Sequence, residues 1–86
     1  MTEETFRGFL SRHHAVFMKY KNEDRAGLVN VWFYDSNFIL SWEECRDGDQ
    51  LNESNYSRDE LHIFPDIDSV IKYISAVDLG IEQFAV

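Results

Sequence analysis

The sequence is short of cysteine, of proline and of long apolar runs. The single cysteine, Cys45, cannot form an internal disulfide, which favours a reducing cytoplasm as the compartment. No apolar run approaches the ~18–20 residues of a membrane-spanning helix, and the start, Met1 to Glu4, lacks the basic-then-apolar plan of a signal peptide. These shortages predict a cytoplasmic protein.

Basic residues and glycines are also few. Eight Lys and Arg face 16 Asp and Glu, for a net charge of −8. Residues 1–27 carry five basic and four acidic side chains, whereas residues 28–86 carry three and 12. Four scattered glycines form no phosphate-binding loop, and no basic patch with interleaved aromatics lies outside the first predicted helix. Direct nucleic-acid binding is therefore disfavoured. The acidity either attracts basic protein surfaces or only keeps the protein soluble.

Apolar and aromatic residues are plentiful, at 44% and 15% of the chain. This much apolar surface can offset the chain entropy lost on folding. A chain of 86 residues is long enough for one core. The sequence predicts a single globular domain over residues 1–86.

The segment Leu28 to Cys45 contains two apolar runs separated by Asp35-Ser36-Asn37, which is typical of an antiparallel hairpin. A two-residue turn at Ser36-Asn37, or a four-residue turn from Asp35 to Phe38, gives one wholly apolar face. That face holds Val29, Val31, Phe33, Leu40 and Trp42. The other face holds Asn30, Trp32, Tyr34, Ile39, Ser41 and Glu43, and suits a thin second layer or a contact surface.

Apolar periodicity predicts the remaining elements. Thr2 caps a first helix that runs to about Lys21, with the apolar stripe Phe6, Phe9, Leu10, His13, Phe17 and Tyr20. Residues 21–27 connect it to the hairpin. A polar stretch over residues 43–60 contains a long loop, 46–60, anchored by Leu51 and Tyr56. Residues 61–64 form a short strand ended by Pro65, residues 66–79 a helix ended by Gly80, and residues 81–86 a last strand, with Phe84 and Val86 facing inward.

The predicted fold is α+β, in the order α-β-β-β-α-β. Its four-stranded, mostly antiparallel sheet carries both helices on one face, as a small two-layer sandwich. The last strand–helix–strand unit fits a right-handed parallel crossover.

Three groups of residues could form a catalytic or metal site, but none matches a known motif. Cys45 with His62 resembles a thiol nucleophile and its base, but a free cysteine is most often a small buried hydrophobe. His13 and His14 would point about 100° apart on a helix and so could not share a metal. Asp47-Gly48-Asp49 fits the start of a calcium loop, whose later ligand positions hold the wrong residues. We therefore predict no enzyme activity, no metal and no cofactor.

In size and charge the chain resembles nuclease-toxin immunity proteins, antitoxins and phage-encoded inhibitors of host defence. The leading hypothesis is an inhibitor that occludes a basic nucleic-acid-processing protein, with carboxylates that mimic DNA phosphates. An alternative is a structural or regulatory homodimer built through the aromatic sheet face or an edge strand. The residues predicted to bind the partner are Trp32, Tyr34, Ile39, Glu43, Glu44, Asp47, Asp49, Glu53, Asp59 and Glu60.

Overall fold

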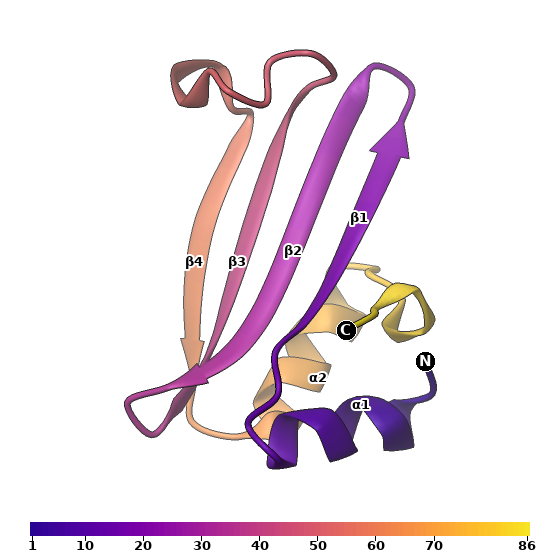
Figure 1. Cartoon of the computed structure of the whole chain (residues 1–86), viewed down its shortest axis with the longest axis vertical. Helices are drawn as coiled ribbons and strands as arrows, with labels where there is room; N and C mark the ends of the chain where they lie inside the picture. Colours follow the sequence, from indigo (N-terminus) through magenta and orange to yellow (C-terminus); the bar gives the residue numbers. More distant parts are fainter.

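The computed structural model has two helices, a four-stranded sheet and two short 3-10 turns (Figure 1). In chain order they are α1 (Glu3–Ser11), β1 (Val16–Asn22), β2 (Arg25–Tyr34), β3 (Asn37–Arg46), η1 (Glu53–Asn55), β4 (Arg58–Phe64), α2 (Ile67–Ala76) and η2 (Ile81–Gln83). The structure describes residues 1–86 except the side chain of Glu53. The α+β class, the presence of two helices and a sheet of four strands are confirmed. The predicted order was wrong, because all four strands precede α2.

The first helix begins where predicted but ends ten residues early. The Thr2 side chain accepts a hydrogen bond from the Thr5 backbone N–H at 3.1 Å, so the N-cap is confirmed. The helix ends at Ser11, and His13 adopts a left-handed φ of 59°. Residues 16–22 then form β1 instead of continuing the helix, since their alternating side chains pair with β2 from Val16↔Val31 to Asn22↔Arg25.

The predicted last strand, and with it the parallel crossover, was also wrong. Residues 81–83 form η2, and only Ala85 bridges to Phe17 of β1, in the antiparallel sense. The reason is burial of one ring: Phe84 is 3% exposed and packs edge-on against Phe6, with ring centroids 5.2 Å apart. This contact pulls the chain into the core, and Val86 stays 58% exposed instead of facing inward.

The sheet is an antiparallel meander, β1-β2-β3-β4. The β2–β3 turn has two residues, Asp35 and Ser36, with φ of 51° and 65°, as in the primed turns that match strand twist. The predicted even turn length is confirmed, but the turn sits closer to β2 than predicted. Pairing therefore shifts by two residues, to Val29↔Trp42, and the predicted faces are unchanged.

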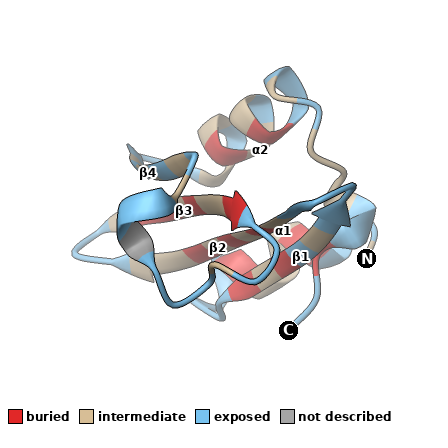
Figure 2. Cartoon of the chain, turned by 90° about the horizontal axis from the view of Figure 1, so that it is seen from above, coloured by how far each residue is buried: buried red, intermediate tan, exposed pale blue. Residues whose placement is uncertain are grey.

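The core lies between one sheet face and both helices. Phe6 and Leu10 of α1, Val70 and Ile74 of α2, and Phe84 pack on the inward side chains of the strands. Those strand residues are Val16, Met18, Val29, Val31, Phe38, Leu40 and Trp42. In Figure 2 the buried residues of α2 lie on its sheet-facing side. No helix in the described part of the chain is long and apolar enough to cross a membrane.

The helices cover only part of the sheet. In Figure 1 the strands extend well beyond α1 and α2, toward the β1–β2 turn and the loop of residues 47–57. At that open end, inward-facing polar side chains contact one another rather than a helix. Among the described residues, no helix packs on the opposite sheet face.

Candidate interaction surface

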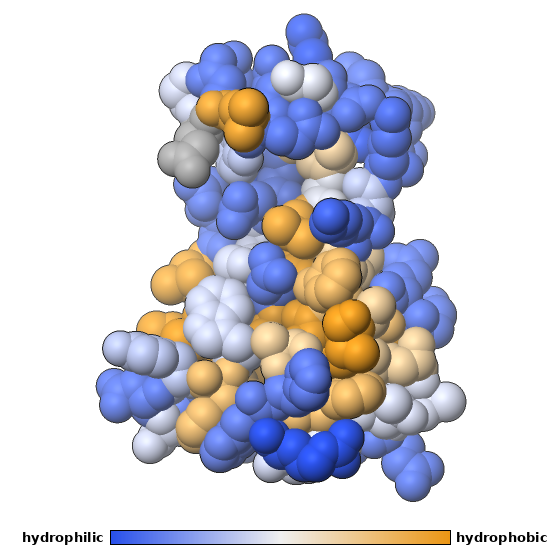
Figure 3. Space-filling view, viewed as in Figure 1, coloured by the Kyte–Doolittle hydropathy of each residue, from blue (hydrophilic) through white to orange (hydrophobic). Residues whose placement is uncertain are grey.

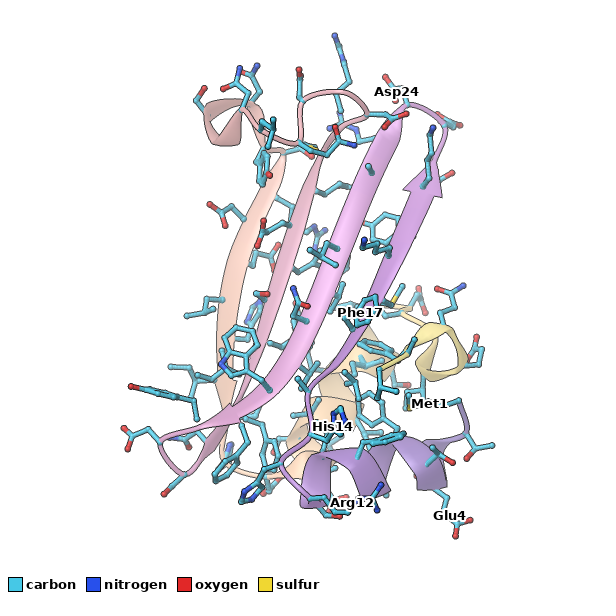
Figure 4. All side chains as sticks on the ribbon, viewed as in Figure 1. Met1, Glu4, Arg12, His14, Phe17 and Asp24 are labelled. Atoms are coloured by element: carbon cyan, nitrogen blue, oxygen red, sulfur yellow. The ribbon has the colours of Figure 1, made fainter. Side chains whose placement is uncertain are left out.

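The sheet face turned away from both helices, called the outer face below, presents side chains from all four strands. Strand register places 16 residues on it. They are Phe17, Lys19 and Lys21 of β1; Ala26, Leu28, Asn30, Trp32 and Tyr34 of β2; Asn37, Ile39, Ser41, Glu43 and Cys45 of β3; and Asp59, Leu61 and Ile63 of β4. Figure 3 views this face, and Figure 4 shows Phe17 projecting from it.

The half of the outer face near the β2–β3 turn is apolar. One cross-strand row joins Trp32, Ile39 and Ile63. Ile39 is only 9% exposed between its neighbours, whereas Tyr34, Leu61 and Ile63 are 66%, 62% and 62% exposed. Hydrophobic residues gather over this half in Figure 3. The structure thus brings together the three predicted aromatic and aliphatic site residues, and adds two exposed aliphatic side chains of β4.

The outer face changes from apolar to ionic toward the loop end. The neighbouring row of Phe17, Asn30, Ser41 and Leu61 mixes apolar and polar residues. The row after it contains Lys19, Leu28, Glu43 and Asp59, one from each strand. Glu43 and Asp59 are direct cross-strand neighbours, and neither forms an ion pair with any described residue. Like charges in such a pair repel each other at a Cβ separation of ~5 Å. An approaching cation would relieve that repulsion.

The loop of residues 47–57 is shorter than the predicted loop 46–60, because β3 ends at Arg46 and β4 begins at Arg58. Tyr56 anchors it as predicted, and its hydroxyl donates to the Gln50 carbonyl at 2.6 Å. Leu51 does not anchor it, because this side chain is fully exposed. The Asp47 backbone N–H donates to the Asp24 carbonyl at 2.6 Å, which joins the loop to the β1–β2 turn (Figure 4).

The loop carboxylates differ in whether they already form ion pairs within the protein. Asp47 pairs with the Lys21 ammonium at 2.6 Å, and hydrogen bonds from Lys21 and Gln50 lower the pKa of Asp47. Asp49 is half-buried and forms no ion pair with a described residue. The Glu53 side chain lies outside the described residues. Asp47 is therefore partly neutralised before any partner arrives.

Two predicted site residues point to the opposite sheet face. The Tyr20 hydroxyl donates to Glu44 Oε1 and accepts from the Trp42 indole N–H, both at 3.0 Å. The Arg58 guanidinium lies 3.8 Å from the Trp42 ring centroid. Glu44 is thus held on the inward face and does not join the outer-face acids.

Glu60 is the second residue turned inward. It accepts from Arg58 at 3.1 Å, contacts His62 Nε2 at 2.8 Å and accepts from the Tyr73 hydroxyl of α2 at 3.3 Å. The hydrogen bond from His62, then the charge of Arg58 and the Tyr73 hydroxyl, lower the pKa of Glu60 against the effect of burial. The Glu60 carboxylate is therefore bound within the protein, by Arg58, His62 and Tyr73, on the face opposite the outer-face acids.

A groove of about 440 Å³ opens at the loop end of the sheet. Its lining includes Lys19, Leu28, Glu43, Cys45 and Tyr56. Burial, then the nearby carboxylates led by Asp49 and Asp47, raise the pKa of the Cys45 thiol. A raised pKa leaves the thiol protonated and weakly nucleophilic near neutral pH.

The structure does not bring together the side chains of the catalytic and metal sites that the sequence suggested. Cys45 lies on the outer face and His62 on the inward face, so they cannot act as nucleophile and base. His13 stacks on Phe33 at 3.7 Å, and His14 contacts Phe9 edge-on. Both lie between α1 and β1, so the argument from helical geometry did not apply. Among the described residues, no three His, Cys, Asp or Glu side chains could hold a metal.

Sequence reasoning missed Leu28, Phe17, Leu61 and Ile63 as outer-face residues. Phe17 was assigned to a helix, and the strand of Leu61 was started three residues late. The sequence signal for the early start of β4 was weak, because Arg58, Asp59 and Glu60 are all polar and apolar and polar residues alternate only from Glu60 to Ile63. Comparisons with protein-family models, curated proteins and solved structures find no match to this chain.

Proposed function

We propose that this protein is a non-catalytic, cytoplasmic inhibitor that binds and occludes a basic, nucleic-acid-processing protein through the outer face. The observation that carries the proposal is the border between exposed apolar side chains and the unpaired Glu43–Asp59 carboxylates. Apolar and aromatic residues supply contact area at interface centres, and rim charges steer association. A surface with both features suits a partner that presents an apolar patch beside basic residues.

Charge favours a basic partner over a second copy of this chain. Each copy carries a formal net charge of −8, so two copies repel each other. In a face-to-face dimer, the only cations that the outer face offers to Glu43 and Asp59 are Lys19 and Lys21, and Lys21 already pairs with Asp47. A basic protein experiences the opposite field, and its DNA- or RNA-binding surface already accommodates anionic groups.

Interface size indicates that the sheet does not act alone. Four strands spaced ~4.8 Å apart, with ~7 residues each at ~3.4 Å, form a face of about 450 Å². A stable interface buries about 800 Å² on each partner. The remainder would come from the flanking loop of residues 47–57 and the β2–β3 turn. The predicted loop residues Asp47 and Asp49 therefore stay in the proposed contact, as does Glu53.

The experiment begins with proteins encoded beside this gene and with a pull-down from the native host. A candidate qualifies when it binds this protein and its nucleic-acid activity falls on addition of this protein. Its association rate should fall steeply as salt rises, because opposite charges attract over about a Debye length. An acidic partner, or association that ignores salt, would contradict the proposal.

Two matched pairs of variants locate the contact. Asp59→Lys should slow association, whereas Glu4→Lys, which makes the same charge change on α1, should leave the rate nearly unchanged. Trp32→Ala should speed dissociation by the equivalent of ~1–3 kcal/mol, whereas Val86→Ala, at a residue 58% exposed elsewhere, should not. If the two variants of each pair changed the association or dissociation rate equally, the outer face would not be part of the interface. A concentration-dependent dimer weakened by Trp32→Ala would favour the homodimer instead.

A further inference from the structure

The two edges of the sheet differ in how they are protected. Edge strands expose backbone N–H and C=O groups that can pair with another chain, and proteins usually protect them with charged side chains, lysine above all, or with prolines or bulges. The β1 edge contains Lys19 and Lys21. Ala85 also covers its start, donating to and accepting from the Phe17 backbone at 2.7 and 2.9 Å.

The β4 edge has no lysine, proline or bulge, and its charged residues, Arg58, Asp59 and Glu60, all lie in its first half, so the half from Leu61 to Phe64 carries no charge that protects it. Pairing with β3 continues without a bulge from Glu44↔Arg58 to Phe38↔Phe64, and the first proline, Pro65, comes after the strand. Among the described residues no element pairs with the free side of β4, which is the left edge of the sheet in Figure 1. This seven-residue strand is available as a template for another strand.

The side chains of β4 add an apolar contact to this backbone template. Leu61 and Ile63 are each 62% exposed and lie where the outer face meets the edge. A strand added beside β4 would cover both and would extend the apolar row of Trp32 and Ile39. Exposed aliphatic residues on an unprotected edge otherwise promote aggregation, so the feature is costly unless it is used.

We propose that an extended segment of the basic partner adds to β4 as a fifth strand. The inference rests on the proposed function, since it names the part of the partner that binds and how it binds. Main-chain hydrogen bonds would supply affinity, and alternate side chains would supply specificity, as in other strand-addition complexes.

The residues of β4 define the sequence of that segment. On the outer face, Ile63 and Leu61 favour apolar neighbours, and Asp59, beside Glu43, favours a basic one. On the inward face, Glu60 and His62 already bond each other, so short uncharged polar residues fit there. Read antiparallel to β4, as every pair in this sheet is, the pattern is apolar-polar-apolar-polar-basic.

A second copy of β4 is disfavoured as the added strand. If two copies paired antiparallel about Leu61, Asp59 of one would face Ile63 of the other, a carboxylate against an aliphatic side chain. Both copies also carry a net charge of −8. Pairing about His62 would instead place Leu61 against Ile63, so charge, and not side-chain order, favours a basic segment from a different protein.

The probe is the peptide acetyl-Thr-Val-Thr-Val-Thr-Arg-Thr-amide, titrated into the ¹⁵N-labelled full chain and followed by NMR. We expect the largest amide shifts at residues 59–64, together with slower hydrogen exchange of β4 amides. An isomer with both valines and the arginine grouped at one end should bind at least about tenfold more weakly, because its side chains lose their places on the edge.

Backbone methylation tests strand pairing directly. In an added strand only alternate N–H groups point at β4. N-methylation of one alternate set of peptide residues should weaken binding at least about tenfold, whereas methylation of the other set should be tolerated. If both methylated peptides bind like the parent, the contact is only ionic and the proposal is wrong.

Variants of the protein complete the test. Leu61→Lys and Ile63→Lys, at exposed residues, should weaken peptide binding about tenfold, whereas Val86→Lys, with the same charge change, should have little effect. Equal effects at all three positions, or a β4-dependent dimer that excludes the peptide, would overturn strand addition. Failure here, with the effects of Trp32→Ala and Asp59→Lys on a protein partner intact, would reject the added strand and leave the proposed inhibitor function standing.

Discussion

Gly27 and Tyr20 offer a quantitative test of the open half of the sheet. They are direct cross-strand neighbours, and the Tyr20 ring lies across the glycine on the inward face. A Cβ built on Gly27 would overlap the Tyr20 ring at Cζ and Cε1. Gly27→Ala must therefore displace a ring that bonds both Glu44 and Trp42.

The expected cost follows from the bonds that the ring would lose. Each hydrogen bond contributes a net ~1 kcal/mol, and the indole N–H of Trp42, a residue only 6% exposed, would lose its acceptor. Replacing a strand glycine by alanine stabilises the protein by ~0.5–1 kcal/mol, because glycine loses more conformational freedom on folding. We expect Gly27→Ala to lower the free energy of unfolding by ~1–3 kcal/mol, and Tm by about 4–8 °C per kcal/mol.

The assay is thermal unfolding followed by circular dichroism, arranged as a double-mutant cycle. In a Tyr20→Leu background, which lacks the ring, Gly27→Ala should be neutral or stabilising. Gly8→Ala is the control, since a Cβ there meets only Arg12 Nη1 at 3.4 Å, and it should stabilise α1. A Gly27→Ala protein that melts like the parent, or effects that simply add, would refute the packing of Tyr20 over Gly27.

The remaining predictions concern the core, acid stability and the cysteine. Ile74→Asp buries an unpaired charge at a residue 1% exposed and should abolish cooperative unfolding in urea; a normal transition would show that α2 is not packed on the sheet. The pKa of Glu60 lies below its ordinary 4.5, so its contribution to stability is present above that pH and is lost as pH falls through the lowered value. Glu60→Gln should therefore flatten the acid limb of a plot of unfolding free energy against pH, and an unchanged limb would count against the His62 contact. Cys45→Ala should cost only packing, ~1 kcal/mol or less, and leave partner inhibition intact; a folded variant without inhibition would revive a role for the thiol.

The two faces of the hairpin of residues 28–45 could be predicted because they depend only on whether the turn has an even or an odd number of residues. Either even-length turn places Trp32 and Glu43 on one face and Trp42 on the other, so a two-residue error in the turn did no harm. The same alternation places Glu44 inward, a step that sequence reasoning did not take. Glu60 was misplaced because the start of β4 was set too late.

The first helix could not be bounded from the sequence because two periods coexist in it. Phe17 and Tyr20 continue the helical spacing of three and four, whereas Val16, Met18 and Tyr20 alternate as in a strand. Only the pairing with Val29 and Val31 of β2 decides between them. A single sequence does not show that long-range partner.

The meander order of the sheet has a consequence for how the chain folds. Each strand pairs with the next one in sequence, so three consecutive hairpins can form by closing short loops. Such local pairing predicts rapid folding for a protein rich in β-structure. The closing step is different in kind, because Phe84 and Ala85 must return to Phe6 and Phe17 from the far end of the chain. We expect this return to be the slow event in folding, since the core stays open on that side until Phe84 and Ala85 are in place.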